Sequence, residues 1–209
     1  MSRRHALTLV ELMLSLAILA VAGLALASML AMVGTATQAD REGRSVLLRT
    51  HAAQTRLRAY LEPSQCVLQH DPARGALAVW LADTRAPNIV NATEMRVLWF
   101  DSAAKTITVE RVEFPEAWSQ TQKDAADINM PASTDFAAVM IAFRSAAYTK
   151  RDVLARGVRT VTWGFNVPAL SSVQGATRVR VTLGMESASG SVQDFMTAMG
   201  LAGYRAPVR

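Results

Sequence analysis

Residues 3–34 read RRHALTLVELMLSLAILAVAGLALASMLAMVG, and this stretch determines how the rest of the chain is organised. From Leu7 to Gly34 the only ionisable side chain is that of Glu11. A membrane-spanning helix needs about 20 mainly apolar residues, so this run is long enough to cross a bilayer. It is also longer than the apolar core of about 7–15 residues in a secretory signal peptide. The stretch therefore predicts a transmembrane helix over residues 7–34.

The basic residues around the apolar run predict its orientation. Arg3 and Arg4 lie directly before it, and the next basic residue is Arg41. Cytoplasmic flanks of membrane helices carry an excess of arginine and lysine. We therefore expect a single-pass anchor in the inner membrane. Its N-terminus would lie in the cytoplasm, and the chain after the helix would lie on the periplasmic, or extracytoplasmic, side.

Glu11 is the unusual residue of this segment. A carboxylate in a membrane helix costs about 2.5–3.5 kcal/mol at the bilayer centre, and such residues usually mark function. A carboxylate in the first turn also suits the helix dipole, so a purely structural role is the alternative. The neighbouring sequence favours function, because two arginines are followed by a small residue, an apolar residue, a threonine, two apolar residues and the glutamate. These six residues are Ala6, Leu7, Thr8, Leu9, Val10 and Glu11.

This order of residues resembles the class III signal of type IV prepilins and type II secretion pseudopilins. The resemblance implies that prepilin peptidase cuts between Ala6 and Leu7, leaving residues 1–6 as a leader peptide. Leu7 would then be N-methylated, and Glu11 would be the family's fifth-position glutamate. The family nearly always has Gly before the cut and most often Phe or Met after it, so Ala6 and Leu7 depart from its pattern. Both substitutes are small or apolar, and we expect slower processing at most.

The resemblance also implies a role for Glu11 in assembly. After cleavage, the ammonium group of Leu7 is a charge in lipid, and the glutamate of a neighbouring subunit can pair with it. Removing one partner of a buried ion pair is strongly destabilising, because it leaves the other charge uncompensated. Such a pair would fix the axial register of one subunit against the next.

An amphipathic segment follows the anchor. Between residues 35 and 62, apolar positions recur on a period of 3.6 residues, while the arginines fall largely on the remaining surface. Pro63 ends the pattern, and a continuous helix over residues 7–62 would be about 84 Å long. Gly34 and Gly43 each weaken it by up to about 1 kcal/mol, which favours a bend or local melting near them. The apolar positions are Val46, Ala53, Leu57, Tyr60 and Leu61.

After Pro63 the apolar residues alternate with a period of two, which predicts a β-rich domain over residues 63–209. Residues 115–135 are expected to be a long loop with at most one helical turn, and 136–143 a strand or a short buried segment. Residues 192–201 are expected to be a final strand or an amphipathic finish. The other expected strands are 65–69, 76–81, 94–100, 106–114, 157–165 and 178–183.

These segments predict an α+β fold class, and the resemblance to pilins implies a long N-terminal helix packed on antiparallel β-sheets. The strand around Val179 and Val181, and the one before it, are similar to the C-terminal half of minor pseudopilins. The J-type pseudopilin of type II secretion and the PilW-like minor pilins are the nearest resemblances. They imply the same pilin-like fold.

The composition excludes several classes of function. The chain has 209 residues and a net charge of +5, but its basic residues are scattered and form no run with interleaved aromatic residues, so no nucleic-acid partner is expected. Cys66 is the only cysteine, which excludes an intramolecular disulfide, and its apolar neighbours predict a buried structural thiol. No motif for a nucleotide, cofactor or small-molecule substrate is present.

No catalytic or metal-binding constellation is apparent. The histidines, His5, His51 and His70, have no second ligand at metal spacing and are expected to be surface residues. The acids of the long loop lack the spacing of a calcium loop, so no metal site is expected. We therefore predict that the protein is not an enzyme. The loop acids are Glu116, Asp124, Asp127 and Asp135, and Trp118 is the tryptophan expected to make contacts with a partner.

The function that follows is a minor pseudopilin or pilin subunit, assembled through its N-terminal helix into a type II secretion pseudopilus or a type IV pilus. Its expected partners are prepilin peptidase, other pilins or pseudopilins and the inner membrane. One alternative is an extracytoplasmic enzyme or binding domain held by an uncleaved signal anchor. Another is a periplasmic domain released by cleavage near Gln38 and Ala39, which the length of the apolar run disfavours.

Overall fold

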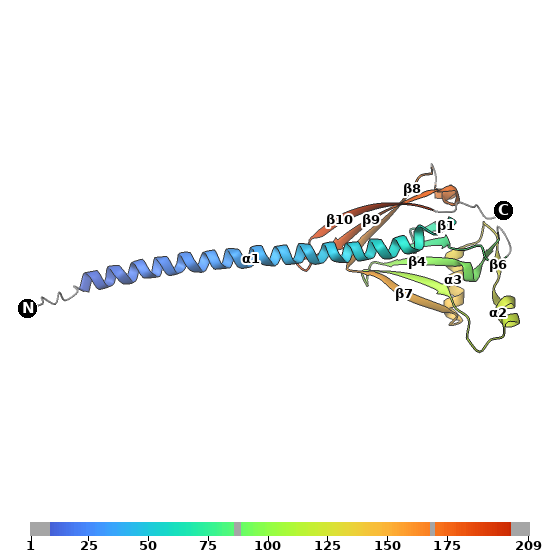
Figure 1. Ribbon diagram of the computed structural model, residues 1–209, viewed down its shortest axis with the longest axis horizontal. Coiled ribbons are helices and arrows are strands. Elements are labelled where there is room, and N and C mark those ends of the chain that lie inside the picture. The colour runs from blue at the N-terminus through green and yellow to red at the C-terminus, as the bar shows by residue number, and fades with distance from the viewer. Residues whose placement is uncertain (1–8, 86–88, 168–169, 202–209) are drawn as a thin grey trace, which may run out of the picture. The chain divides into compact units, whose positions relative to one another are not determined.

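The computed structural model of the protein describes residues 9–85, 89–167 and 170–201 (Figure 1). The chain forms two compact units, Met1–Ser45 and Val46–Arg209, and the boundary between them falls inside one helix, α1 (Leu9–Leu61). Antiparallel β-sheets follow the helix, so the predicted pilin-like α+β fold class is confirmed.

Helix α1 is α-helical at every residue from Leu9 to Leu61. Gly34 and Gly43 lie inside it without interrupting the helical pattern, so the expected local melting at these glycines is absent. A single glycine costs a helix only about 1 kcal/mol, which the good helix formers on either side offset. In the first unit, every described residue up to Arg41 is exposed.

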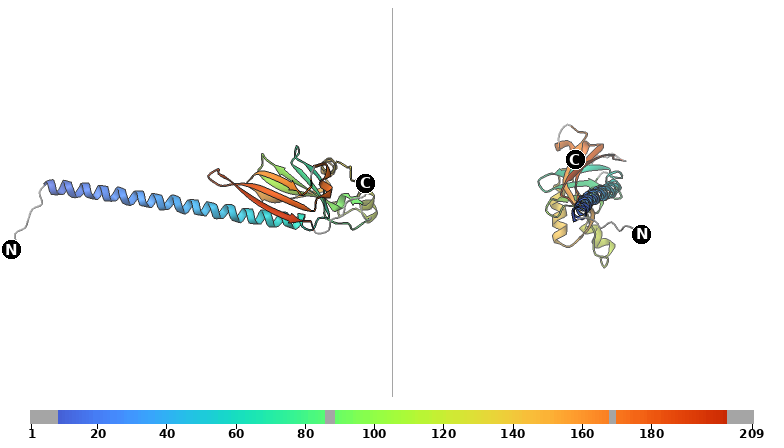
Figure 2. Two further views of the ribbon diagram at one scale, coloured as in Figure 1. Left: turned by 90° about the horizontal axis from the view of Figure 1, so that it is seen from above. Right: turned by 90° about the vertical axis from the view of Figure 1, so that its left-hand side faces the viewer.

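The second unit contains three antiparallel sheets (Figures 1 and 2). The largest has the strand order β1-β2-β4-β5-β7, the next has the order β10-β9-β8, and β3 pairs with β6. The first sheet consists of β1 (Cys66–Asp71), β2 (Ala76–Trp80), β4 (Met95–Asp101), β5 (Thr106–Val112) and β7 (Thr149–Arg156). The others consist of β8 (Val158–Phe165), β9 (Arg178–Glu186) and β10 (Val192–Gly200), and of β3 (Val90–Asn91) and β6 (Asn129–Met130).

The five-stranded sheet is covered on both faces. Alternate residues of a strand point to opposite faces, and along β4 the side chain of Leu98 enters one core cluster while those of Val97 and Trp99 enter the other. The first cluster includes residues of α1 and of the three-stranded sheet. The second includes α3 (Phe136–Ser145), so α1 and α3 pack on opposite faces.

The part of α1 in the second unit buries one stripe against the first cluster. Four positions of the predicted stripe are buried as expected, whereas Tyr60 is half-buried. Thr50 completes the stripe and was missed because it is polar. Its hydroxyl donates to the carbonyl oxygen of Val46 at 2.8 Å, so the buried hydroxyl is satisfied within the helix. The buried stripe is Val46, Thr50, Ala53, Leu57 and Leu61.

Leu57 tests how much this stripe stabilises the second unit. Its side chain is 0% exposed, and Leu57→Ala should lower the free energy of unfolding by about 2–5 kcal/mol, from lost burial and the cavity left behind. Urea unfolding of the detergent-solubilised chain, followed by tryptophan fluorescence, measures the loss, since all four tryptophans lie after residue 46. Leu48→Ala, at a position 72% exposed, should change stability by less than about 0.5 kcal/mol. Equal losses in the two variants would contradict this account of the core.

Three predictions for the β-rich domain are corrected by the structure. Residues 136–145 form helix α3, not a strand, because Asp135 caps it by accepting from the amide of Ala138 at 3.0 Å. The long loop contains α2 (Gln120–Ala126), capped by Ser119 and longer than one turn, and the short strand β6. Strand β7 was not predicted at all. Its sequence, TKRDVLAR, carries four charged residues, and its pairing partner, β5, lies 37 to 50 positions earlier in the chain.

Candidate functional site

The described part of the chain begins at Leu9, the first residue of α1. His5 and the predicted cleavage and methylation residues, Ala6 and Leu7, lie outside the described residues. Glu11 lies in the first turn of α1, where the positive end of the helix dipole favours a carboxylate. It is the only ionisable residue between Leu9 and Ala39.

The polar residues within the apolar part of α1 are satisfied by the helix itself. The hydroxyls of Ser15 and Ser28 donate to the carbonyl oxygens of Leu12 and Ala25 at 2.9 and 2.8 Å. Thr35 makes the same bond to Met32 at 2.9 Å. An unsatisfied hydroxyl would be costly in lipid, and these bonds remove that cost. By length and composition, α1 is the one helix among the described residues that qualifies to cross a membrane.

The character of α1 changes after residue 37. Gln38 contacts Glu42 at 3.4 Å, and Asp40 forms an ion pair with Arg44 at 3.0 Å, both at a spacing of four residues. Such pairs stabilise helices that are exposed to water. The apolar segment suited to lipid therefore ends near residue 37.

Three arginines of α1 in the second unit contact the sheets. The guanidinium of Arg49 donates to the carbonyl oxygen of Glu186 at 3.2 Å, and that of Arg56 donates to the carbonyl oxygen of Leu154 at 3.1 Å. Arg58 donates to the hydroxyl of Thr197 at 3.2 Å. The sequence pattern placed these side chains on the face away from the core. Arginine is long enough to reach around a helix, so the periodicity of apolar residues gave no signal for the contacts.

The remaining surface of α1 in this unit carries exposed apolar side chains. Leu47 and Leu48 are 55% and 72% exposed, and Ala52 and Ala59 are also exposed. Basic residues are exposed beside them, so this surface mixes apolar and basic side chains, and its apolar positions can pack against a second helix. This surface, with the apolar segment before it, is the candidate assembly site.

Three acids of the long loop, Asp124, Asp127 and Asp135, have structural partners, and the first two share Arg85. Asp127 is buried and accepts from the amide and hydroxyl of Thr93 at 2.9 and 2.6 Å. Asp124 pairs with Arg85, and Asp135 caps α3 and pairs with Arg74 at 2.9 Å. Within the described part of the chain, no three histidine, cysteine, aspartate or glutamate residues lie close enough to hold a metal ion.

The structure buries Cys66, as expected, but it also half-buries His70, which was expected at the surface. Cys66 is buried, and burial raises the pKa of its thiol to about 12, which makes it an unreactive structural residue. His70 was expected at the surface and is instead half-buried, with its ring 5.3 Å from that of Phe165. Burial lowers the pKa of His70 below its ordinary value of 6.5, although the charge of Asp71 opposes this shift.

The lowered pKa makes stability depend on pH near neutrality. The unfolded chain protonates His70 at a higher pH than the native chain does, so the stabilisation is complete above pH 6.5 and is lost as the pH falls below it. The free energy of unfolding should therefore fall as the pH is lowered through 6.5. His70→Gln should flatten this slope, whereas His51→Gln, at an exposed position of α1, should leave it unchanged. An unchanged slope in His70→Gln would contradict the assignment.

Trp118, which is expected to contact a partner, also packs within the second unit. Its ring stacks on Phe114, with centroids 5.6 Å apart, and meets the edge of Tyr148 at 5.0 Å. The side chain is half-buried and packs on the second core cluster. Its principal role is to hold the segment that follows β5 against the sheet.

Comparison with known proteins places the N-terminal segment in a family. Residues 1–27 match the family described as Prokaryotic N-terminal methylation motif. This match covers the arginines, the predicted cleavage site, Glu11 and most of the apolar run. The N-terminal segment is prepilin-like. A separate comparison with curated proteins found no match.

The prepilin-like motif and the geometry of α1 agree. The motif occupies the start of a helix that is apolar, exposed and long enough to span a membrane. Proteins with this motif are typically structural subunits. Together the motif and the helix indicate a single-pass anchor in the inner membrane.

Proposed function

We propose that the protein is a minor pseudopilin or pilin subunit that assembles through α1 into a type II secretion pseudopilus or a type IV pilus. The observation that carries the proposal is the methylation motif at residues 1–27, at the head of an apolar helix that continues into the β-rich unit. Prepilin peptidase cuts between Ala6 and Leu7, and the new N-terminus at Leu7 is methylated.

The membrane topology follows from the charges at the start of the chain. Arg3 and Arg4 hold the N-terminus in the cytoplasm, and the second unit lies on the periplasmic side. Residues 7–34 are the membrane segment, 35–62 continue the helix in water, and 63–209 are the extracytoplasmic domain. Before assembly, the subunit waits in the inner membrane as a single-pass protein.

Assembly uses two parts of α1. The carboxylate of Glu11 pairs with the methylated ammonium of Leu7 on a neighbouring subunit and sets the axial register. The outer surface around Leu47 and Leu48, exposed in the single chain, packs against helices of sister subunits. The β-rich unit then makes lateral or tip contacts, which is the role expected of a minor subunit.

The mass of the N-terminal peptide tests the proposal. The protein is expressed with and without a prepilin peptidase, recovered from membranes and digested. We expect a peptide that begins at Leu7 and carries one added methyl group, only when the peptidase is present. Ala6→Gly should increase the processed fraction, and an arginine at position 6 should abolish it. An intact N-terminus despite an active peptidase, or cleavage near Ala39, would overturn the proposed function.

A further inference from the structure

Strand β10 has an open outer edge. The amide of Ser187 donates to the carbonyl oxygen of Ser191 at 2.8 Å, and the amide of Leu201 donates to that of Thr177 at 3.0 Å. Hydrogen-bonded pairs alternate along an antiparallel ladder, so these two bonds fix which residues of β10 bond to β9. Bonds to β9 are made by the backbone groups of residues 193, 195, 197 and 199. The backbone groups of residues 192, 194, 196, 198 and 200 point away from β9.

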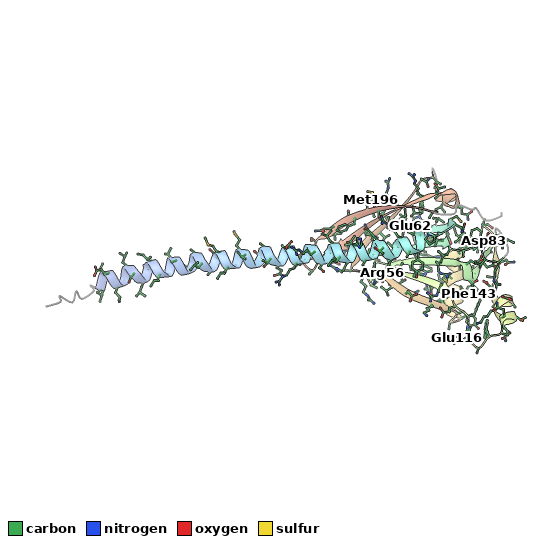
Figure 3. The ribbon with its side chains drawn as sticks, in the orientation of Figure 1. Arg56, Glu62, Asp83, Glu116, Phe143 and Met196 are labelled. Atoms are coloured by element: carbon green, nitrogen blue, oxygen red, sulfur yellow. The ribbon has the colours of Figure 1, made fainter. Side chains whose placement is uncertain are left out.

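No protein group occupies this outer edge in the part of the chain that the structure describes. These five residues are all exposed, and Met196, labelled in Figure 3, is 64% exposed. The nine register pairs with β9 run without a bulge. A long, regular edge of this kind is a template for pairing with another strand.

The other edge strands of the two larger sheets carry features that disfavour pairing. The outer carbonyl of Leu154 in β7 accepts from Arg56, and β7 also has a register shift against β5. The carbonyl oxygen of Leu68 in β1 accepts from Gln174 at 3.1 Å. Strand β8 has a register shift near Val158. Bulges and covered edges protect sheets from strand addition, and β10 has neither.

Two arginines next to this edge lack acidic partners. Arg178 and Arg180 lie on β9, opposite Gly200 and Ala198 of β10, and both side chains are exposed. Neither guanidinium forms an ion pair among the described residues. On the same face, Glu186 is already paired with Lys105 at 2.5 Å. Asp194 lies about 13 Å along β10 from Ala198, too far to neutralise them.

The small residues beside these arginines leave room for a ligand. Gly164 of β8 and Ala198 flank Arg180 on either side, and a hollow of about 290 Å³ is lined by these three residues and Arg178. A strand added to β10 would lie about 10 Å from β9, with only Ala198 and Gly200 between its side chains and the arginines. A carboxylate on that strand is within reach of an extended arginine side chain.

We propose that the open edge of β10, with Arg178 and Arg180, is a strand-addition site for an extended, carboxylate-bearing segment of another polypeptide. Main-chain hydrogen bonds to residues 194, 196 and 198 would supply affinity, and the two arginines would select acidic side chains. The inference goes beyond the proposed function, since assembly through α1 does not use this edge.

A second copy of β10 is the less suitable occupant. Arg49 contacts Glu186 of β9, which lies opposite Val192 at the start of β10, and Arg58 contacts Thr197 further along, so β10 runs in the same direction as this part of α1. An antiparallel pair of β10 strands would set these parts of the two helices antiparallel, which does not suit two subunits inserted into one membrane in the proposed topology. A parallel pair would offer the two arginines only one carboxylate, that of Asp194, so the occupant we propose is a different, more acidic segment.

Peptide binding to the full chain in detergent micelles tests the site. The probes are a fluorescent peptide of alternating valine and glutamate and its valine–lysine counterpart, measured by anisotropy. We expect the glutamate peptide to bind at least about tenfold more tightly than the lysine peptide at low salt. Raising the salt from about 50 to about 500 mM should reduce the difference. Equal affinities, or no binding of the glutamate peptide, would overturn the proposal.

Two variants separate the edge from the arginines. Met196→Pro removes an outward N–H without removing a bond to β9, so binding should weaken about tenfold, whereas Met196→Leu should bind as the wild type. Arg180→Glu should weaken binding of the glutamate peptide about tenfold, whereas Arg156→Glu on β7 makes the same charge change elsewhere and should have little effect. If Met196→Pro bound as tightly as Met196→Leu, strand addition would be wrong. None of these measurements depends on the peptidase, so their failure leaves the proposed function intact.

Discussion

Arg144→Leu should lower the free energy of unfolding of the second unit by about 3 kcal/mol, because it leaves a buried carboxylate without its main partner. Glu110 is 1% exposed and accepts from Arg144 Nε at 2.9 Å and from Arg144 Nη2 at 2.5 Å. Although burial by itself raises the pKa of Glu110, the hydrogen bonds from Arg144 and Thr149 lower it overall. Arg144 also covers the ring of Trp99 at 4.8 Å. Urea unfolding at neutral pH measures the loss.

A double variant distinguishes the ion pair from simple packing. Arg144→Leu combined with Glu110→Leu should recover most of the lost stability, since two apolar side chains replace both charges. Arg111→Leu is the matched control, because Arg111 pairs with the half-exposed Asp152 at 2.8 Å and should cost about 1 kcal/mol or less. If the double variant were no more stable than Arg144→Leu, the buried charge would not be the cause.

Glu11→Gln should reduce co-assembly of the processed subunit about a hundredfold, while leaving cleavage and membrane insertion intact. The reason is that the proposed partner, the ammonium of Leu7 on the next subunit, would remain in lipid without a counter-charge, at a cost of about 3 kcal/mol. Crosslinking of the subunit into the assembled filament, compared with the amount of processed protein in the membrane, measures the ratio.

Two matched variants test whether the loss of assembly is specific to the carboxylate of Glu11. Glu11→Asp keeps the carboxylate and should retain most of the assembly, whereas Glu42→Gln makes the same chemical change in the exposed part of α1 and should have no effect. Assembly of Glu11→Gln at the wild-type level would show that register does not depend on this pair. A loss of processing in Glu11→Gln would instead place the residue in recognition by the peptidase.

The sequence predicted the features that depend on local periodicity. The apolar run, its flanking charges and the stripe that includes Val46 and Leu57 all follow a helical period that neighbouring residues set, so α1 and the fold class could be read directly. The regular alternation of residues 94–114 likewise gave the hairpin of β4 and β5. Helix α3 was also encoded locally, by Asp135 before an apolar run, but that cap signal was overlooked in favour of the ambiguous periodicity.

The sequence also determined the candidate site, because the prepilin-like motif is a short run of consecutive residues. Only the tertiary structure decided what distant residues do together. Strand β7 is a strand because β5 pairs with it, and Glu110 is tolerated in the core because Arg144 reaches it from α3. The open edge of β10 likewise depends on which strands find partners. These features arise from contacts between residues far apart in the chain, and no local pattern of apolar and polar residues records such contacts.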